Sequence, residues 1–355
     1  MDIKQDLWGY LKETKKPIVM YGIGNGADKI LERLDAIGVT VADFFASDGF
    51  VRGQKFHGKT VLSFSQIKEK YGKDNIIVLV AFASSLPDVM NTIAKVSEEC
   101  ETYIPDVPVR GDNVFCEKFE REHCENIKKA YSLLSDERSK EVFEGVINFR
   151  RTGRLDILQS TSDDPDSVLE ELLHFDQYRI IGDIGAYNGD TAEEILKRCP
   201  LAEKIYSLEP DRRNFRKLSA FAEGNDKIIP INAAAWNEST TLIFDDSGNR
   251  NSGLAENGVS KRRAEVNAIA LDSIFVEGVD YIKYDVEGAE KEALEGSRLI
   301  ISKYRPDLLI SIYHRTEDLH ALILQLHDIC PEYKLYIRRY PYIPAWDLNL
   351  YATVK

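Results

Sequence analysis

The chain has 355 residues, with 46 Lys and Arg against 59 Asp and Glu, so its formal net charge is −13. This length is typical of two domains, and the negative charge argues against a general affinity for nucleic acid or anionic membranes. The five cysteines lack the paired spacing of a zinc site or a disulfide framework, so we assign no metal ligands. We predict a cytoplasmic protein, because the sequence shows no signal peptide and no apolar run long enough to span a bilayer.

The first predicted domain, residues 1–110, begins with an apolar strand that leads into a glycine-bearing turn. The turn reads G-x-G-x-x-A from Gly22 to Ala27, which is a variant of the dinucleotide fingerprint. Further alternation of strands and helices predicts a small parallel sheet. A glycine turn that merely joins a strand to a helix is the alternative. The candidate nucleotide-binding residues are Gly22, Gly24, Asn25, Gly26 and Asp48, the last at the end of the second strand, where a ribose-binding carboxylate would lie.

This first segment also resembles the small Rossmann-like domains that precede sugar-nucleotide acyltransferases. The residues that carry the resemblance are Tyr21-Gly22-Ile23-Gly24-Asn25-Gly26, Ser47-Asp48-Gly49 and Gly53-Gln54-Lys55-Phe56-His57-Gly58. In those relatives the module binds part of a nucleotide-linked sugar, so the resemblance implies a similar fold and leaves the ligand open.

A helical connector is predicted over residues 111–177. The preceding stretch, residues 105–112, has the Pro- and Gly-bearing composition of a linker. Beyond it, residues 115–134 and 139–149 are rich in charge and carry apolar residues at helical spacing. Helices that are polar on most sides usually bridge domains or cover one side of an active site.

The third predicted part, residues 178–355, opens with a strand, a glycine-bearing loop and a helix. This arrangement places backbone amides and a helix N-terminus around a ligand. Asp183 and Asp190 would repel a pyrophosphate, whereas a ligand with a positive charge and hydroxyl groups suits them. The stretch therefore predicts a site for S-adenosyl-L-methionine. Its candidate cofactor-binding residues are Asp183, Gly185, Ala186, Tyr187, Asn188, Gly189, Asp190 and Thr191.

Further candidates follow at the ends of the next two strands. Glu209 ends the strand of residues 204–208, where a carboxylate could accept hydrogen bonds from both hydroxyls of an adenosine ribose. An ordinary acid at a strand end is the alternative. The remaining cofactor candidates are Pro210, Asp211, Asn232, Ala233 and Ala234. Residues 239–270 then predict an antiparallel insertion with a polar loop around Gly248 and Gly253.

The second acidic stretch follows a strand that ends near Tyr284. Lys283 and Asp285 point the same way in strand geometry, and Asp285 and Glu287 lie at its end. Carboxylates there can stabilise a sulfonium cation or its amino group, or bind a metal; capping of the next helix is the alternative. A later strand ends at His314, a candidate base that could equally be structural.

Together these motifs resemble the FkbM family of S-adenosylmethionine-dependent methyltransferases. The residues that carry the resemblance are 183–191, 282–290, 311–314, 335–340 and 350–352, and the helical segment at 134–139 also fits. The resemblance implies an α/β fold with a seven-stranded class I methyltransferase sheet, and O-methylation of a hydroxyl, often on a sugar or a polyketide-type product.

The predicted mechanism is an in-line attack by an acceptor hydroxyl on the methyl group of the cofactor. His314 is the predicted base, assisted or replaced by Asp285, with Lys283 orienting that acid. Two other readings stay open: an oxidoreductase that uses the Gly22-x-Gly24 loop, and a non-catalytic nucleotide-binding protein. The expected partner is a small-molecule or glycan acceptor, nucleotide-linked or not, and the oligomeric state is open.

Overall fold

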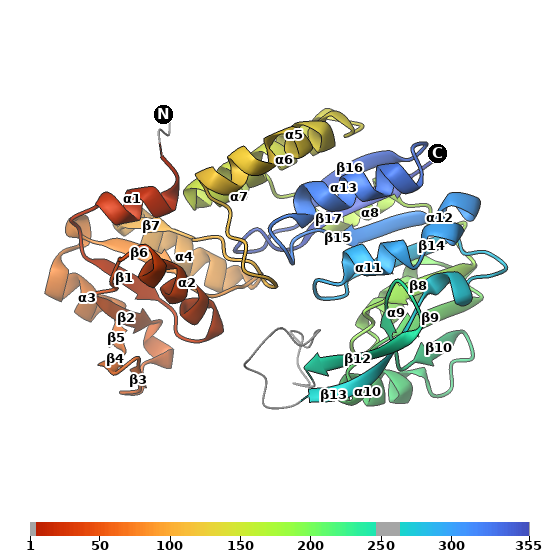
Figure 1. Ribbon diagram of the computed structural model, residues 1–355. Coiled ribbons are helices and arrows are strands. Elements are labelled where there is room, and N and C mark those ends of the chain that lie inside the picture. Colours follow the sequence, from red (N-terminus) through yellow and green to blue (C-terminus); the bar gives the residue numbers. More distant parts are fainter. Residues whose placement is uncertain (1–4, 246–262, 355) are drawn as a thin grey trace.

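The computed structural model describes residues 5–245 and 263–354. Figure 1 shows two lobes, each built around its own sheet, with helices α5 and α6 running along the side that faces the top of the view. The N-terminal lobe is coloured red to orange, and the C-terminal lobe green to blue.

The N-terminal lobe is built on a five-stranded sheet in the order β5-β2-β1-β6-β7, in which every neighbouring pair is parallel. The predicted parallel sheet is thus confirmed, and the chain crosses to the opposite side of β1 when it reaches β6. The strands are β1 Ile18–Tyr21, β2 Asp43–Ala46, β5 Leu62–Ser63, β6 Ile77–Val80 and β7 Glu101–Tyr103. The other elements are α1 Leu7–Glu13, α2 Asn25–Ala36, α3 Phe64–Tyr71, α4 Pro87–Glu99, the hairpin β3 Lys55–Phe56 with β4 Lys59–Thr60, and the short 3-10 helices η1 Asp48–Phe50 and η2 Lys73–Asn75.

The C-terminal lobe is built on a mixed seven-stranded sheet in the order β10-β9-β8-β14-β15-β17-β16. β17 runs antiparallel to the other six strands, which are parallel to one another. The seven-stranded methyltransferase sheet implied by the sequence is therefore confirmed. The strands are β8 Ile180–Ile184, β9 Lys204–Leu208, β10 Ile228–Ile231, β14 Tyr281–Tyr284, β15 Asp307–Ser311, β16 Lys334–Arg339 and β17 Leu348–Thr353. The helices are α9 Asp190–Arg198, α10 Arg212–Ala222, α11 Glu290–Glu295, α12 Arg298–Tyr304, α13 Asp318–Ile329 and the 3-10 helix η3 Leu271–Ser273.

The predicted insertion forms a small sheet of three strands, β11 Ala234–Ala235, β12 Thr240–Asp245 and β13 Arg263–Ile269. β12 and β13 pair antiparallel, as expected, whereas β11 pairs parallel with β13. The polar loop around Gly248 and Gly253 lies outside the described residues.

Four helices connect the two sheets: α5 Glu117–Ser132, α6 Glu137–Thr152, α7 Leu155–Ser160 and α8 Pro165–Leu172. α5 packs against α13, and α6 packs against the edge strand β16. The Ser135 and Ser139 hydroxyls accept hydrogen bonds of 2.8 Å and 2.9 Å from the backbone N–H groups of Leu335 and Ile337. These hydroxyls satisfy amides that an edge strand would otherwise leave open for pairing with another chain.

A single hydrophobic cluster runs through both lobes. It includes Val78 of β6, Phe143 of α6 and Ile310 of β15, each at most 1% exposed. Parallel strands covered on both faces by helices are expected to be apolar throughout, and β6 follows this pattern, as does the middle of β15 from Leu308 to Ile310. Among the described residues, no helix combines the length and the apolar composition that crossing a membrane requires.

Asp136 fastens the connector to the sheet. Its side chain caps α6 by accepting a hydrogen bond from Ser139 N at 2.8 Å, and it pairs at 2.6 Å with Arg338, which is only 3% exposed. Burial raises the pKa of the Asp136 carboxyl, but the hydrogen bonds from Arg338 and Ser139 outweigh this and lower it.

We expect Asp136→Ala to lower the free energy of unfolding by about 2–4 kcal/mol, because it leaves the Arg338 guanidinium buried without its carboxylate and removes a helix cap. Urea denaturation at neutral pH measures this loss. The control is Asp164→Ala, which removes the exposed cap of α8 and leaves no buried charge, so its effect should be smaller. Equal losses in the two variants would contradict the proposed importance of the buried pair.

Candidate active site

The loop after β8 lies against the end of β14. Gly185 has a φ of +91°, and a Cβ atom placed on it would lie 1.9 Å from the carbonyl oxygen of Asp285. Only glycine fits there, because the conformation is left-handed and the contact is with backbone that cannot move aside. The amides of Gly185 and Ala186 both donate to the carbonyl of Leu208 on β9, at 3.0 Å and 2.9 Å. The ends of β8, β9 and β14 therefore meet at one point.

Glu209 lies at this point and is only 6% exposed. Its two carboxylate oxygens accept hydrogen bonds from the amides of Tyr187 and Asp211, at 2.9 Å and 2.8 Å. Burial raises the pKa of the Glu209 carboxyl to about 8, although these two hydrogen bonds oppose the shift. Each oxygen can accept a further hydrogen bond. Asn232 supports the turn by donating to the carbonyls of Glu209 and Pro210.

Asp183 belongs to β8 itself, whereas the sequence placed it in the following loop. Its side chain is fully buried, and burial raises the pKa of its carboxyl to about 6 although Lys283 opposes this shift. Lys283 donates to the Thr191 hydroxyl at 3.1 Å and lies 3.7 Å from Asp285. The lysine thus links the first turn of α9 to the acid at the end of β14, as the predicted orienting role requires.

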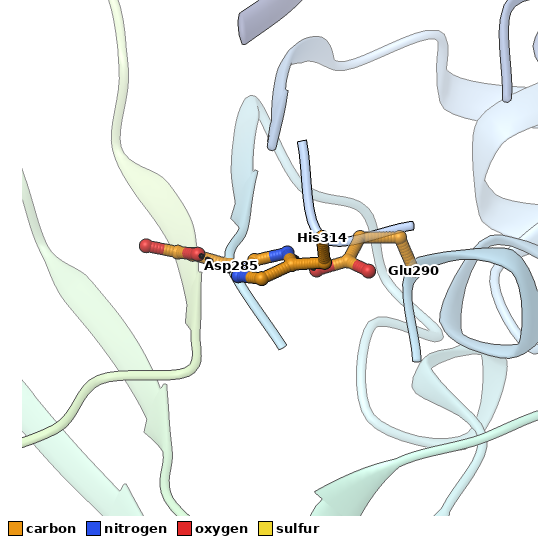
Figure 2. A group of neighbouring side chains, drawn as sticks. All are labelled: Asp285, Glu290 and His314. Atoms are coloured by element: carbon orange, nitrogen blue, oxygen red, sulfur yellow. Dashed lines mark ion pairs between the residues drawn. The ribbon is translucent and has the colours of Figure 1, made fainter. Parts of the chain in front are cut away.

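His314 follows β15 and lies between carboxylates, as Figure 2 shows for Asp285 and Glu290. Its Nδ1 is 2.9 Å from Glu290 Oε1, and its Nε2 is 3.6 Å from Asp285 Oδ1 and 3.8 Å from Glu287 Oε2. Neither Asp285 nor Glu287 caps α11, whose N-cap is Ala289, so the capping alternative is wrong. Glu290 was part of the sequence motif, but nothing in the motif indicated that it would contact His314.

The electrostatics conflict with the predicted role of His314 as the base. Burial lowers the pKa of the imidazole, but Glu290, Glu287 and Asp285 outweigh burial and raise it to about 10. At neutral pH the isolated side chain is then an imidazolium, which has no lone pair to accept a proton. This shift favours Asp285 over His314 as the proton acceptor, and the identity of the base stays a prediction.

A cavity of about 240 Å³ opens where these residues meet. It is lined by much of the predicted site: Gly185, Tyr187, Asp190, Thr191, Glu209, Pro210, Ala233, Ala234, Lys283, Asp285, Glu287 and His314. The other predicted residues are not in the lining: Asp183, Ala186, Asn188, Gly189, Asp211 and Asn232. Asp211, for example, lies outside the lining and caps α10.

Sequence reasoning missed an aromatic wall of this cavity. Tyr313, Tyr342 and Trp346 all line it, and the Trp346 ring lies 6.2 Å from that of Tyr313 and 5.7 Å from that of Tyr342. The aromatic residues between β16 and β17 were visible as a cluster in the sequence. Because they are far along the chain from the glycine loop, the sequence did not indicate that both line the same cavity.

The N-terminal lobe also reaches the cavity. Val109, in the segment between β7 and α5, contributes to the lining, and the next amide, Arg110 N, donates to the carbonyl of His314 at 2.8 Å. Ser84 and Ile343 exchange backbone hydrogen bonds of 2.8 Å and 2.9 Å, which fasten the aromatic wall to the N-terminal lobe.

The glycine turn of the N-terminal lobe lies apart from this lining, between β1 and α2. A Cβ atom on Gly22 would lie 2.6 Å from the Phe82 ring, and one on Gly26 would lie 2.4 Å from the carbonyl oxygen of Ala81. Packing thus explains these two glycines without a nucleotide, whereas Gly24 has open space around it and begins α2, next to Asn25. Asp48 lies in η1, directly after β2.

Comparison with known proteins agrees with this geometry. Residues 183–336 match the model of the methyltransferase FkbM domain. The crystal structure of a methyltransferase FkbM from Methylobacillus flagellatus KT is 21% identical and has a TM-score of 0.72, covering 95% of this chain and 90% of that chain. The fold of both lobes is therefore shared with that protein.

Two further solved structures resemble a smaller part of the chain. Fibrillarin from Aeropyrum pernix, in complex with natively bound S-adenosyl-L-methionine, is 17% identical with a TM-score of 0.33, covering 52% of this chain and 72% of that chain. An rRNA methylase from Streptococcus thermophilus is 16% identical with a TM-score of 0.35, covering 53% and 92%. Among curated proteins, no significant match is found. The match over residues 183–336 identifies this part of the chain as a methyltransferase domain of the FkbM type.

Proposed function

We propose that the chain transfers a methyl group from S-adenosylmethionine to a hydroxyl of a sugar, glycan or related small molecule. The observation that carries the proposal is that buried Glu209, Asp285 and the aromatic wall all line one cavity. Glu209 suits an adenosine ribose, and Asp285 with the aromatic wall suits an acceptor that presents a hydroxyl and an apolar face.

In this proposal the cofactor lies along the loop after β8. Glu209 accepts hydrogen bonds from the ribose hydroxyls, and the small side chains of Ala233 and Ala234 leave room for the adenine ring. The acids Asp183 and Asp190 give this part of the cavity a negative potential, which favours the positive charges of the methionine portion. Asp183 does not line the cavity, so its effect on the ligand is electrostatic.

The acceptor lies on the other side of the methyl group. Its oxygen attacks the methyl carbon while the carbon–sulfur bond breaks, and the hydroxyl proton passes to Asp285, which Lys283 orients. Most of the rate comes from aligning the oxygen with the methyl carbon. Because Val109 and the Ser84–Ile343 contact lie on this side, we assign the N-terminal lobe to the acceptor, including a nucleotide-linked one.

The test of this function uses S-adenosylmethionine with a trideuterated methyl group. The protein is incubated with pools of nucleotide sugars and free glycans, and mass spectrometry looks for products in which that group replaces one hydrogen. The expected product keeps the label when ester bonds are hydrolysed, as an ether does. Labelled nitrogen or carboxylate products, or no labelled product together with tight cofactor binding, would contradict the proposal.

The affinity for S-adenosylhomocysteine should depend on pH through Glu209. The ionised carboxylate binds ribose hydroxyls better than the acid does, and its pKa in the free protein is about 8. Below that value binding must release a proton, so affinity should rise with pH by up to about tenfold per unit between about pH 6 and 8, and then level off. Calorimetry in buffers of different ionisation enthalpy measures the released proton.

The matched control for this experiment is Glu209→Gln. It keeps the shape of the side chain and removes the titration, so binding should be weaker and nearly independent of pH over the same range. A wild-type affinity that does not change with pH would argue against a ribose contact at Glu209.

Trp346→Ala should raise the KM for the acceptor by about fivefold to tenfold, because an aromatic contact contributes about 1 kcal/mol. Its affinity for S-adenosylhomocysteine should stay within about twofold of the wild type. Trp236→Ala is the mirror-image control, since Trp236 lines the cavity beside Ala233 to Ala235 and should affect the cofactor instead. Identical effects of the two variants would contradict the two-sided arrangement.

A further inference from the structure

The acids around His314 leave several buried atoms without hydrogen-bond partners. These atoms are Glu287 Oε2, Glu290 Oε2 and both ring nitrogens of His314. His314 is fully buried and Glu290 is 1% exposed, so water cannot easily satisfy them. Unpartnered polar atoms at such depth are costly, and each requires a physical explanation.

The spacing of these atoms fits a metal ion. Asp285, Glu290 and His314 each offer a ligand atom, and these atoms all lie within 4.8 Å of one another. Glu287 is not part of that group of three, but its Oε2 lies 3.8 Å from His314 Nε2. Nitrogen and oxygen ligands bind first-row divalent ions at about 2.0–2.2 Å, so two ligands at right angles lie about 3 Å apart. Nε2 is 3.6 Å from Asp285 Oδ1, so a small inward movement completes the coordination.

Glu290 lies on the opposite edge of the imidazole ring. Its Oε1 is 2.9 Å from Nδ1, and the same oxygen accepts a 3.0 Å hydrogen bond from Val286 N, which fixes its position. A histidine that binds a metal through one nitrogen usually donates its other N–H to a carboxylate, which sets the tautomer and the ring orientation. The His314–Glu290 ion pair has the spacing of this arrangement, and Nε2 lies on the side of Asp285 and Glu287.

The backbone of Glu287 supports the same interpretation. This residue has a φ of +55°, a conformation that costs energy in any residue with a side chain. The turn brings the Glu287 carboxylate within reach of His314. Strain of this kind is typical of functional sites, because the surrounding structure must stabilise it.

We propose that His314 Nε2, Asp285 and Glu287 bind one divalent first-row transition-metal ion, with Glu290 as the positioning residue behind the histidine. One imidazole nitrogen with carboxylate oxygens, and no thiolate, suits Mn²⁺ and its neighbours better than a soft ion. His314 and both ligand acids line the cavity, so the ion's remaining coordination positions face the acceptor.

Several carboxyl groups surround this position. Lys283 lies 3.7 Å from Asp285 and also contacts Thr191, while Arg110 opposes the rise in the pKa of the Glu287 carboxyl. The carboxyl groups are those of Asp285, Glu287 and Glu290, together with Asp318, which interacts electrostatically with both Glu290 and His314. The positive charge of a divalent ion favours the ionised forms of these groups.

The test is Mn²⁺ binding to the metal-stripped, full-length protein, followed by electron paramagnetic resonance and equilibrium dialysis with elemental analysis. We expect one ion per chain. His314→Gln and Asp285→Asn should weaken binding by about 100-fold or more, and Glu290→Gln by about 10–100-fold. His174→Gln is the matched control, because His174 pairs with Asp307 at 2.8 Å in a similar way but lies outside the cavity lining, and it should leave binding unchanged.

A measurement on the wild type guards against variants that fail to fold. Pulsed electron paramagnetic resonance of bound Mn²⁺ should show coupling to one imidazole nitrogen, since the site contains one histidine. No stoichiometric binding, or bound Mn²⁺ without nitrogen coupling, would overturn the metal site. Calorimetry with S-adenosylhomocysteine tests the proposed function separately from the metal site. The metal site rests on that function only for its role towards the acceptor. A protein that binds Mn²⁺ but not S-adenosylhomocysteine would therefore contradict the proposed function and leave the metal site intact.

Discussion

The active site depends on one close approach, between the backbone of Gly185 and the carbonyl oxygen of Asp285. No side chain fits between them, since a Cβ on Gly185 would lie 1.9 Å from that oxygen. The contact holds the ends of β8 and β14 together, and the hydrogen bonds from the same loop to Leu208 add β9. Three strand ends thereby converge, and the acids that follow them face one cavity although they are far apart in the sequence.

Because these strand ends converge, several carboxylates are buried. Burial raises the pKa of Asp183, Glu209 and Glu287 to about 6, 8 and 7. The fold offsets this cost with backbone amides at Glu209 and with cationic side chains at the other two. A positive charge beside these carboxyl groups favours their ionised forms, so the electrostatics of the cavity favour a cationic ligand.

Much of the fold could be predicted because its signals are local. The strand of residues 204–208 and Glu209 at its end were found from neighbouring residues alone, and the structure has them in the same places. Long-range contacts were not visible in this way. Glu290 reaches His314 only through the pairing of β14 with β15, and Trp346 reaches the cavity only because β17 pairs with β15. The packing around Gly22 and Gly26 was hidden for the same reason, since the atoms that a side chain there would meet belong to Ala81 and Phe82.

The position of β17 has a consequence for synthesis on the ribosome. This strand comes after all the other described strands in the chain, yet it lies between β15 and β16 in the sheet. Until it emerges, β15 has an open edge and β16 has no partner strand, whereas every strand of the N-terminal sheet is already complete. The N-terminal lobe can therefore fold while translation continues, but the catalytic lobe must wait with an exposed edge, which is the state most prone to aggregation and most in need of a chaperone.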